Sequence, residues 1–160
     1  MADVILAALI LTPAVITYIF RSNAALSFLT LAGAFTLITF GSADLKNLTG
    51  HLDLRIDSST LNLILLVLPL FFTLLFARRA FSGKLKLTLH LVTALLTGTL
   101  LALISVPLLN ASARADFADS WAWANLQKIQ TPIVAAGLIL SLILIWFAKH
   151  PKHDKKHKHK

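Results

Sequence analysis

The chain has 160 residues, of which 57% are hydrophobic and 14% are charged. Soluble domains carry about 25% charged residues, so a water-soluble globule of this composition would expose far too much apolar surface. The 15 Lys and Arg residues outnumber the seven Asp residues, and the sequence contains neither Glu nor Cys. These counts exclude a soluble enzyme, a disordered chain and a disulfide scaffold. They leave a polytopic integral membrane protein.

Five long intervals without Asp, Lys or Arg predict transmembrane helices. A spanning helix needs about 20 predominantly apolar residues, with a range of about 17–25. Inside hydrocarbon every backbone amide must be paired within the protein, and the alternation of outer-membrane strands is absent, so we expect an all-α fold. The predicted spans are Val4–Phe20, Ala24–Phe40, Leu61–Ala77, Leu89–Leu109 and Pro132–Ala148.

The first span is expected to be retained rather than cleaved as a signal peptide. Its leader, Met1-Ala2-Asp3, carries no positive charge, and its apolar run is longer than the usual h-region. The alternative is cleavage at the small residues Ser22-Asn23-Ala24, which faintly resemble a signal-peptidase site. We favour an uncleaved first helix.

The distribution of charge predicts the orientation in the membrane. Positive residues are retained on the cytoplasmic side, and the bias is counted over short loops. With five spans, the first turn, the third connection and the C-terminal tail share one side and hold eleven Lys and Arg with one Asp. The other side holds four Lys and Arg with six Asp. We therefore expect the N-terminus outside and the C-terminus inside, in a multi-pass protein of the plasma (inner) membrane.

The lengths of the connections predict the domain organisation. The turn Arg21–Asn23 and the connection Arg78–Lys86, with its turn point at Gly83, favour two antiparallel hairpins followed by a fifth helix. We expect one transmembrane helical domain over residues 1–148 and a disordered cytoplasmic tail over residues 149–160.

Two outer segments, 43–60 and 110–131, are expected at the membrane interface. Within the second segment, Asp116–Gln130 mixes Trp and other apolar residues with Asp and Lys. Trp favours the headgroup boundary, because its ring is apolar and its N–H needs a partner. This pattern predicts one short amphipathic helix on the outer surface, which is either an interfacial element or a lid or partner-docking element.

Pro13 and Pro69 occupy similar positions in the two predicted hairpins, since each is followed by a Thr four residues later. The match reflects either a parallel repeat or chance. Each proline removes an amide donor and presses on the carbonyl four residues earlier, so both helices are predicted to kink. Such kinks could border a transport cavity, but we favour a static kink that improves packing.

Residues with catalytic potential are scarce. No carboxylate lies in a predicted span, and the chain contains no phosphate-binding glycine loop and no metalloprotease motif. We therefore expect no enzymatic activity and no cofactor. His90 is the one ionisable residue well inside an apolar interval, which makes it a candidate intramembrane polar site. We favour an interfacial histidine on a packing face over a gating or ligand role, because His90 lies about one helical turn after Lys86.

Small residues at helical spacing predict close contacts between helices. After His90, small side chains recur every four residues along the fourth helix, and this spacing lets two helices approach closely. Small residues in the second and fifth helices are the expected contact points. Threonines in the second and fourth helices either line a polar path or bond to their own helices, and we favour the second reading. The helix-packing candidates are Ala94, Gly98, Ala102, Gly137, Ser141 and Gly33.

The tail Lys149–Lys160 contains six lysines and four histidines. We favour attraction to anionic lipid headgroups, at about 1 kcal/mol for each Lys near the surface. Metal binding by the imidazoles is a weaker alternative, because the interleaved lysines repel a cation. A third interpretation is contact with acidic proteins or nucleic acid through charge, without specific nucleic-acid recognition. The candidate metal ligands are His150, His153, His157 and His159.

Two functions remain open from the sequence, ahead of a membrane enzyme, which would need an activity lost on changing His90 or His51. The first is a non-enzymatic accessory, scaffold or assembly subunit, which would bind another membrane protein. The alternative is an oligomeric transporter or channel subunit for a small solute. A five-helix protomer of this size has little room for a pathway of its own, so the alternative requires a homo-oligomer.

Overall fold

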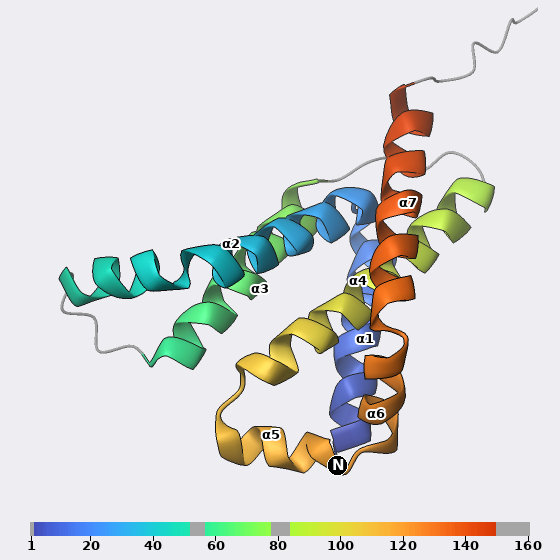
Figure 1. Ribbon diagram of the computed structural model, residues 1–160. Coiled ribbons are helices and arrows are strands. Elements are labelled where there is room, and N and C mark those ends of the chain that lie inside the picture. The colour runs from blue at the N-terminus through green and yellow to red at the C-terminus, as the bar shows by residue number, and fades with distance from the viewer. Residues whose placement is uncertain (1, 52–56, 78–83, 150–160) are drawn as a thin grey trace, which may run out of the picture.

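The computed structural model describes the backbone of residues 2–51, 57–77 and 84–149, and the side chains of residues 2–41, 57, 59–77 and 87–147. Over these ranges the chain forms seven helices and no strand. The helices, shown in Figure 1, are α1 (Ala2–Phe20), α2 (Ala24–His51), α3 (Ser58–Phe76), α4 (Lys84–Leu108), α5 (Ala111–Ala118), α6 (Trp121–Lys128) and α7 (Gln130–Lys149).

Five of these helices are long and apolar enough to cross a membrane. Their apolar stretches agree with the predicted spans to within two residues at each end. The all-helical fold class and the five membrane-competent helices are therefore confirmed for the described ranges. The stretches are Ala2–Phe20, Ala24–Gly41, Ser59–Phe76, Leu87–Leu108 and Gln130–Phe147.

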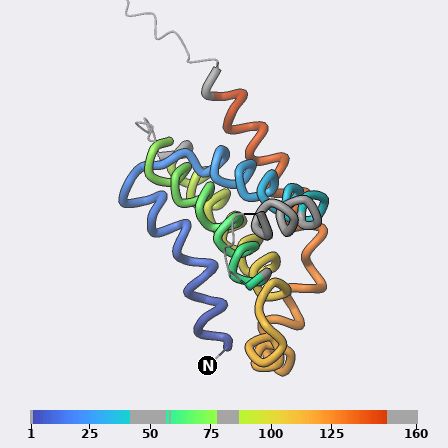
Figure 2. The backbone as a smooth tube through the Cα atoms, turned by 90° about the vertical axis from the view of Figure 1, so that its left-hand side faces the viewer, coloured from blue at the N-terminus to red at the C-terminus, as the bar shows by residue number. Residues whose placement is uncertain are grey.

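Helix α4 is the centre of the bundle. α1 and α7 lie on opposite sides of it in Figure 2, while α2 and α3 form a pair that extends to one side in Figure 1. In α4, 61% of the apolar stretch is buried, against 17–39% in the other four helices. The outward faces of those four carry large apolar side chains, such as Phe71 and Leu142.

Two large clusters and one small cluster of buried apolar side chains form the core among the described residues. One large cluster joins α2, α3 and α4 and includes Phe28, Leu66 and Leu101. The other large cluster includes Leu6 of α1 and Trp123 of α6, and it also draws on α4, α5 and α7. The first cluster ties the α2–α3 pair to α4. The second ties α5 and α6 to the end of the bundle where α1 begins.

The structure pairs the helices differently from the predicted hairpins. Among the described residues, α1 packs chiefly against α4, and α2 packs chiefly against α3. Arg21, between α1 and α2, has a φ of 50°, in the left-handed region. Two residues later, the backbone N–H of Asn23 donates to the Ala77 carbonyl at 2.8 Å. The turn is therefore tied to the end of α3, and α2 leaves α1 obliquely (Figure 1).

The outer segment between α4 and α7 also differs from its prediction. In place of one amphipathic helix over Asp116–Gln130, the structure has the two short helices α5 and α6. Phe117 and Trp123 are both buried in the second core cluster. Six residues apart on a straight helix, they would point about 120° away from each other. The break at Asp119 and Ser120 lets both rings enter the core.

Helix α2 runs as one helix of 28 residues to His51, beyond the predicted end at Phe40. Part of the first outer segment is therefore helical, and residues 52–56 of that segment lie outside the described ranges. Helices α1 and α3 continue through Pro13 and Pro69. The kinks expected at both positions stay a prediction.

Candidate functional site

The row of small residues in α4 lies against α1. Ala94 belongs to a buried cluster with Ala14 of α1 and Ala24 of α2. One turn further along α4, a Cβ at Gly98 would stand 2.7 Å from the carbonyl carbon and 2.8 Å from the Cα of Ile10, and closer still to the carbonyl oxygen. Only glycine permits this approach, because real Cβ contacts stay well beyond these distances.

The register between these helices is antiparallel. As residue numbers rise along α4, its contacts on α1 fall from Ala14 to Ile10, and Ala102 then shares the second core cluster with Leu6. Small residues at this spacing let backbones approach closely, and dispersion across the contact stabilises the pair. The α4 row is thus part of the main helix–helix contact of the bundle.

The candidates on α7 and α2 fall in different surroundings. Gly137 faces Phe28 of α2, since a Cβ at Gly137 would come within 3.0 Å of the Cδ2 atom of that ring and closer to its outer carbons. Ser141, one turn further along α7, is fully buried, and its hydroxyl has no hydrogen-bond partner within the described part of the chain. Gly33 is exposed, and a Cβ there would meet nothing within 4 Å. The structure brings Gly137 and Ser141 into helix contacts but not Gly33.

His90 starts the same α4 row and is 8% exposed. Since α1 and α4 are antiparallel and Ala94 lies against Ala14, His90, one turn before Ala94, lies toward the end of α1. Buried polar side chains gather there, among them Thr17 and Ser22. His90 therefore belongs to a polar group of residues at the end of the bundle where α1 stops and α2 begins.

The polar groups at this end bond largely to one another. Ser22 Oγ donates to Thr17 Oγ1 at 3.3 Å, and Asn23 Oδ1 accepts from the backbone N–H of Ala25 at 3.2 Å. Ser27 Oγ donates to the Asn23 carbonyl at 3.3 Å. These bonds shape the α1–α2 turn and cap the start of α2, as Asn does at helix N-termini. Among the described side chains of this polar group, the only ionisable one is the His90 imidazole.

Several hydroxyls farther inside the bundle, unlike that of Ser141, donate to the backbone of their own helices. Thr93, Thr97 and Ser105 of α4 each donate to the carbonyl four residues earlier, at 2.7–2.9 Å. Thr73 of α3 donates to the Pro69 carbonyl at 2.8 Å and also lies 3.1 Å from Thr30 Oγ1 of α2. Hydroxyls bonded in this way do not line a shared polar path, and only the last pair links two helices.

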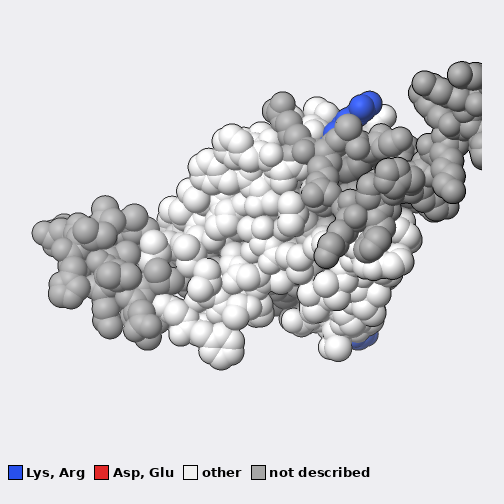
Figure 3. Space-filling view, turned by 90° about the horizontal axis from the view of Figure 1, so that it is seen from above, with Lys and Arg blue, Asp and Glu red and all other residues white. Residues whose placement is uncertain are grey.

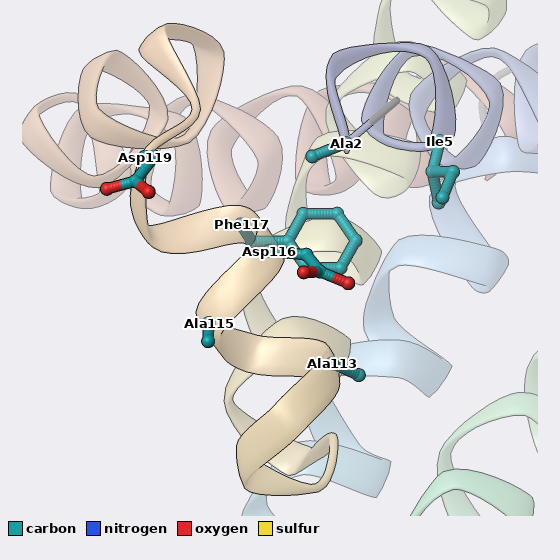
Figure 4. A pocket seen from close by; sticks show the side chains of 7 residues that line it. All are labelled: Ala2, Ile5, Ala113, Ala115, Asp116, Phe117 and Asp119. Atoms are coloured by element: carbon teal, nitrogen blue, oxygen red, sulfur yellow. The ribbon is translucent and has the colours of Figure 1, made fainter.

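At the opposite end of the bundle, a pocket of about 670 Å³ lies between the start of α1 and α5. Figure 4 shows Asp116 directed toward Ile5 on the α1 side, while the carboxylate of Asp119 points away on the far side of Phe117. The two carboxylates do not converge on one point. No group of three metal-ligating side chains occurs among the described residues.

A hydrogen bond near this pocket joins α1 to α6. Ser120 Oγ donates to the carboxylate of Asp3, and the same Oγ accepts from the backbone N–H of Trp123 at 3.2 Å. Ser120 therefore caps α6 and fixes it to the first turn of α1. A charge-assisted bond of this type is stronger than a neutral one.

The sequence contains a local signal for these caps. Ser and Asn directly before a helix are preferred N-caps, because their side-chain oxygens accept a free backbone N–H. Ser120 and Asn110 both act in this way, and Asn110 Oδ1 accepts from Ala113 N at 3.0 Å. The contact of Ser120 with Asp3, 117 positions away, has no local signal.

The predicted tail site lies outside the described residues. This applies to its four candidate metal ligands, which fall within residues 150–160, and to the side chain of Lys149. Metal binding and lipid binding by the tail therefore stay predictions.

Comparison with models of known protein families, with curated proteins and with solved structures finds no match.

Proposed function

We propose that the chain is an integral membrane protein that serves as a non-enzymatic accessory, scaffold or assembly subunit. One observation carries the proposal: the described interior of the bundle holds close helix contacts and several hydroxyls that bond to their own helices. Gly98 meets the backbone of Ile10, Gly137 meets the ring of Phe28, and the hydroxyl of Thr97 bonds within α4. A packed interior of this kind suits a protein that presents its outer surfaces to partners.

The outer surface supports a membrane setting. The described side chains in Figure 3 are almost all uncharged, and the exposed faces of α3 and α7 consist of large apolar residues such as Phe72 and Ile139. A continuous apolar surface of this extent is unfavourable in water and favourable in lipid. We place the protein in the plasma (inner) membrane as a multi-pass protein.

Two long-range hydrogen bonds agree with successive membrane crossings by α1, α2, α3 and α4. The bond between Asp3 and Ser120 joins the start of α1 to the connection between α4 and α7. The bond between Asn23 and Ala77 joins the α1–α2 turn to the end of α3. Each bond links segments that five spans would place on one side of the membrane. One side of the membrane would then hold eleven Lys and Arg and the other side four. Because positive residues are retained in the cytoplasm, this distribution favours an outside N-terminus and an inside C-terminus.

Single cysteines test this orientation cleanly, because the chain has no cysteine of its own. Ser112→Cys should react with an impermeant maleimide added to intact cells, whereas Ser82→Cys should react only after the membrane is opened. Ser141→Cys is the buried control and should stay unlabelled in both conditions. Labelling of Ser82→Cys from outside would reverse the assigned orientation.

Purification of the tagged full-length chain from native membranes in mild detergent tests the role. A scaffold or assembly subunit should co-purify in stable amounts with other membrane proteins and should cross-link to them before extraction. An unrelated five-span protein, tagged in the same way, controls for non-specific association. Recovery of a closed homo-oligomer alone would count against the scaffold role.

The alternative role as an oligomeric transporter or channel subunit is favoured by a single feature. The buried polar group that includes Thr17, Ser22 and His90 lies at one end of the bundle, and His90 gives it an ionisable side chain. Intramembrane ionisable residues often mark transport pathways. The alternative predicts a homo-oligomer whose reconstituted vesicles pass a small solute, with flux lost in His90→Ala and retained in Gly33→Ala.

A further inference from the structure

Helix α6 has two chemically different faces. Trp123 is 8% exposed and belongs to the core cluster that contains Leu6 and Ile133. Trp121, two residues earlier, is 79% exposed. Residues two apart on a helix point about 160° from each other, so one ring is held in the protein while the other is presented outward. An exposed indole on a fixed helix favours an environment that is apolar on one side and polar on the other, because both its apolar ring and its N–H need partners.

The outward face of α6 also carries a basic residue. Lys128 is exposed and lies seven residues after Trp121, which places it within about 20° of the same helix face. The Asn125 side chain donates to the Trp121 carbonyl at 2.9 Å within this face. An indole and an ammonium group on one face of a short helix, at the end of the bundle, are typical of a membrane-interface helix.

A second exposed tryptophan marks the other end of the bundle. Trp146 is 60% exposed near the end of α7, and Tyr18 is 62% exposed near the end of α1. Figure 1 shows these two helix ends on the same side, opposite α6. From Gln130 to Trp146, sixteen residues rise about 24 Å, which is close to the hydrocarbon thickness of about 30 Å. Exposed aromatic side chains thus lie near both ends of one span.

We propose that the outward face of α6 binds the phospholipid surface of the outer leaflet. The indole of Trp121 lies at the boundary between headgroups and acyl chains, and Lys128 lies beside the lipid phosphates. Because Asp3 and Trp123 hold α6 against the bundle, this contact sets how deeply the whole protein sits in the bilayer. The inference rests on the proposed membrane setting, and it adds the residues that define the outer boundary.

Single-tryptophan variants of the full chain test the proposal in phospholipid vesicles. Two of the three tryptophans are replaced by Phe, leaving Trp121, Trp123 or Trp146, and fluorescence is quenched by lipids brominated either near the ester groups or deep in the chains. We expect Trp121 and Trp146 to be quenched about twofold more by the shallow bromines than by the deep ones. Trp123 is the enclosed control and should respond less than either to both lipids.

Quenching by aqueous iodide, measured in vesicles of unbrominated lipid, distinguishes a Trp121 ring in water from one that is covered. If Trp121 is quenched by iodide and not by brominated lipid while Trp146 responds to lipid, α6 stands in water and the proposal is overturned. If Trp121 responds to neither quencher, another protein surface or a second copy covers it, and the proposal is overturned as well. A lack of lipid quenching at all three positions, with no flotation on vesicles, would instead remove the membrane setting itself.

Discussion

Replacement of Gly98 by alanine should separate the two most intimately packed helices of the bundle. The added Cβ would stand 2.7 Å from the carbonyl carbon of Ile10, whereas carbon atoms in contact stay about 3.5 Å apart. The helices must therefore move apart by about 0.8 Å or more at this point. The neighbouring atoms belong to the α1 backbone, so no side-chain rotation can relieve the clash.

The expected loss of stability follows from two opposing effects. Overpacking costs about 1–3 kcal/mol, and a clash with backbone belongs at the upper end of that range. Alanine also gains about 1 kcal/mol over glycine in a helix interior. The net loss for Gly98→Ala should be about 2 kcal/mol, or roughly 30-fold in the unfolding equilibrium constant.

Gly33→Ala is the matched control, since it makes the same chemical change on α2 where a Cβ meets nothing within 4 Å. It should be neutral or stabilising by up to about 1 kcal/mol. Reversible unfolding of both variants in mixed micelles, with increasing denaturing detergent and circular dichroism as the readout, compares them directly. Equal stabilities for Gly98→Ala and Gly33→Ala would refute the close α1–α4 contact.

Three further predictions address other contacts. Gly137→Ala should lower the free energy of unfolding by about 1 kcal/mol, because the added Cβ meets the ring of Phe28. Phe28→Leu in the same chain should restore part of the loss, and a double-mutant cycle in the same assay measures the coupling. Ser120→Ala should cost about 1–2 kcal/mol in thermal unfolding, since it removes the cap of α6 and the link to α1, whereas Ser112→Ala should change stability little. Deletion of residues 152–160 should weaken co-sedimentation with anionic vesicles but not with neutral ones. If the full chain instead binds zinc at micromolar concentration and the deletion abolishes this binding, the metal interpretation is favoured.

The spans were accessible from sequence because the bilayer imposes a simple rule on every helix. A stretch without Asp, Lys or Arg and with about 20 apolar residues can satisfy its backbone only as a helix. The predicted spans agree with the apolar stretches of α1, α3 and α7 to within two residues. The α4 row around Gly98 was accessible for a similar reason, since a spacing of four places residues on one helix face.

The pairing of helices was not accessible in the same way. The short connections predicted hairpins between helices that follow each other in the chain. In the structure, Arg21 adopts a left-handed conformation and the N–H of Asn23 bonds to the Ala77 carbonyl, so α2 packs against α3 rather than α1. Similarly, Gly33 and Gly98 carry the same local signal, and only one of them meets another helix.

The sequence by itself determined the helical class, the five membrane-competent helices and the helix faces rich in small residues. Tertiary structure alone decided which helices meet, that the outer segment breaks at Ser120, and that Trp123 turns inward while Trp121 turns outward. The reason is physical. Lipid tails are as apolar as leucine side chains, so hydrophobicity in a membrane helix does not separate the face toward a neighbour from the face toward lipid. That choice depends on shape and hydrogen bonds between segments distant in the chain, such as Asp3 and Ser120.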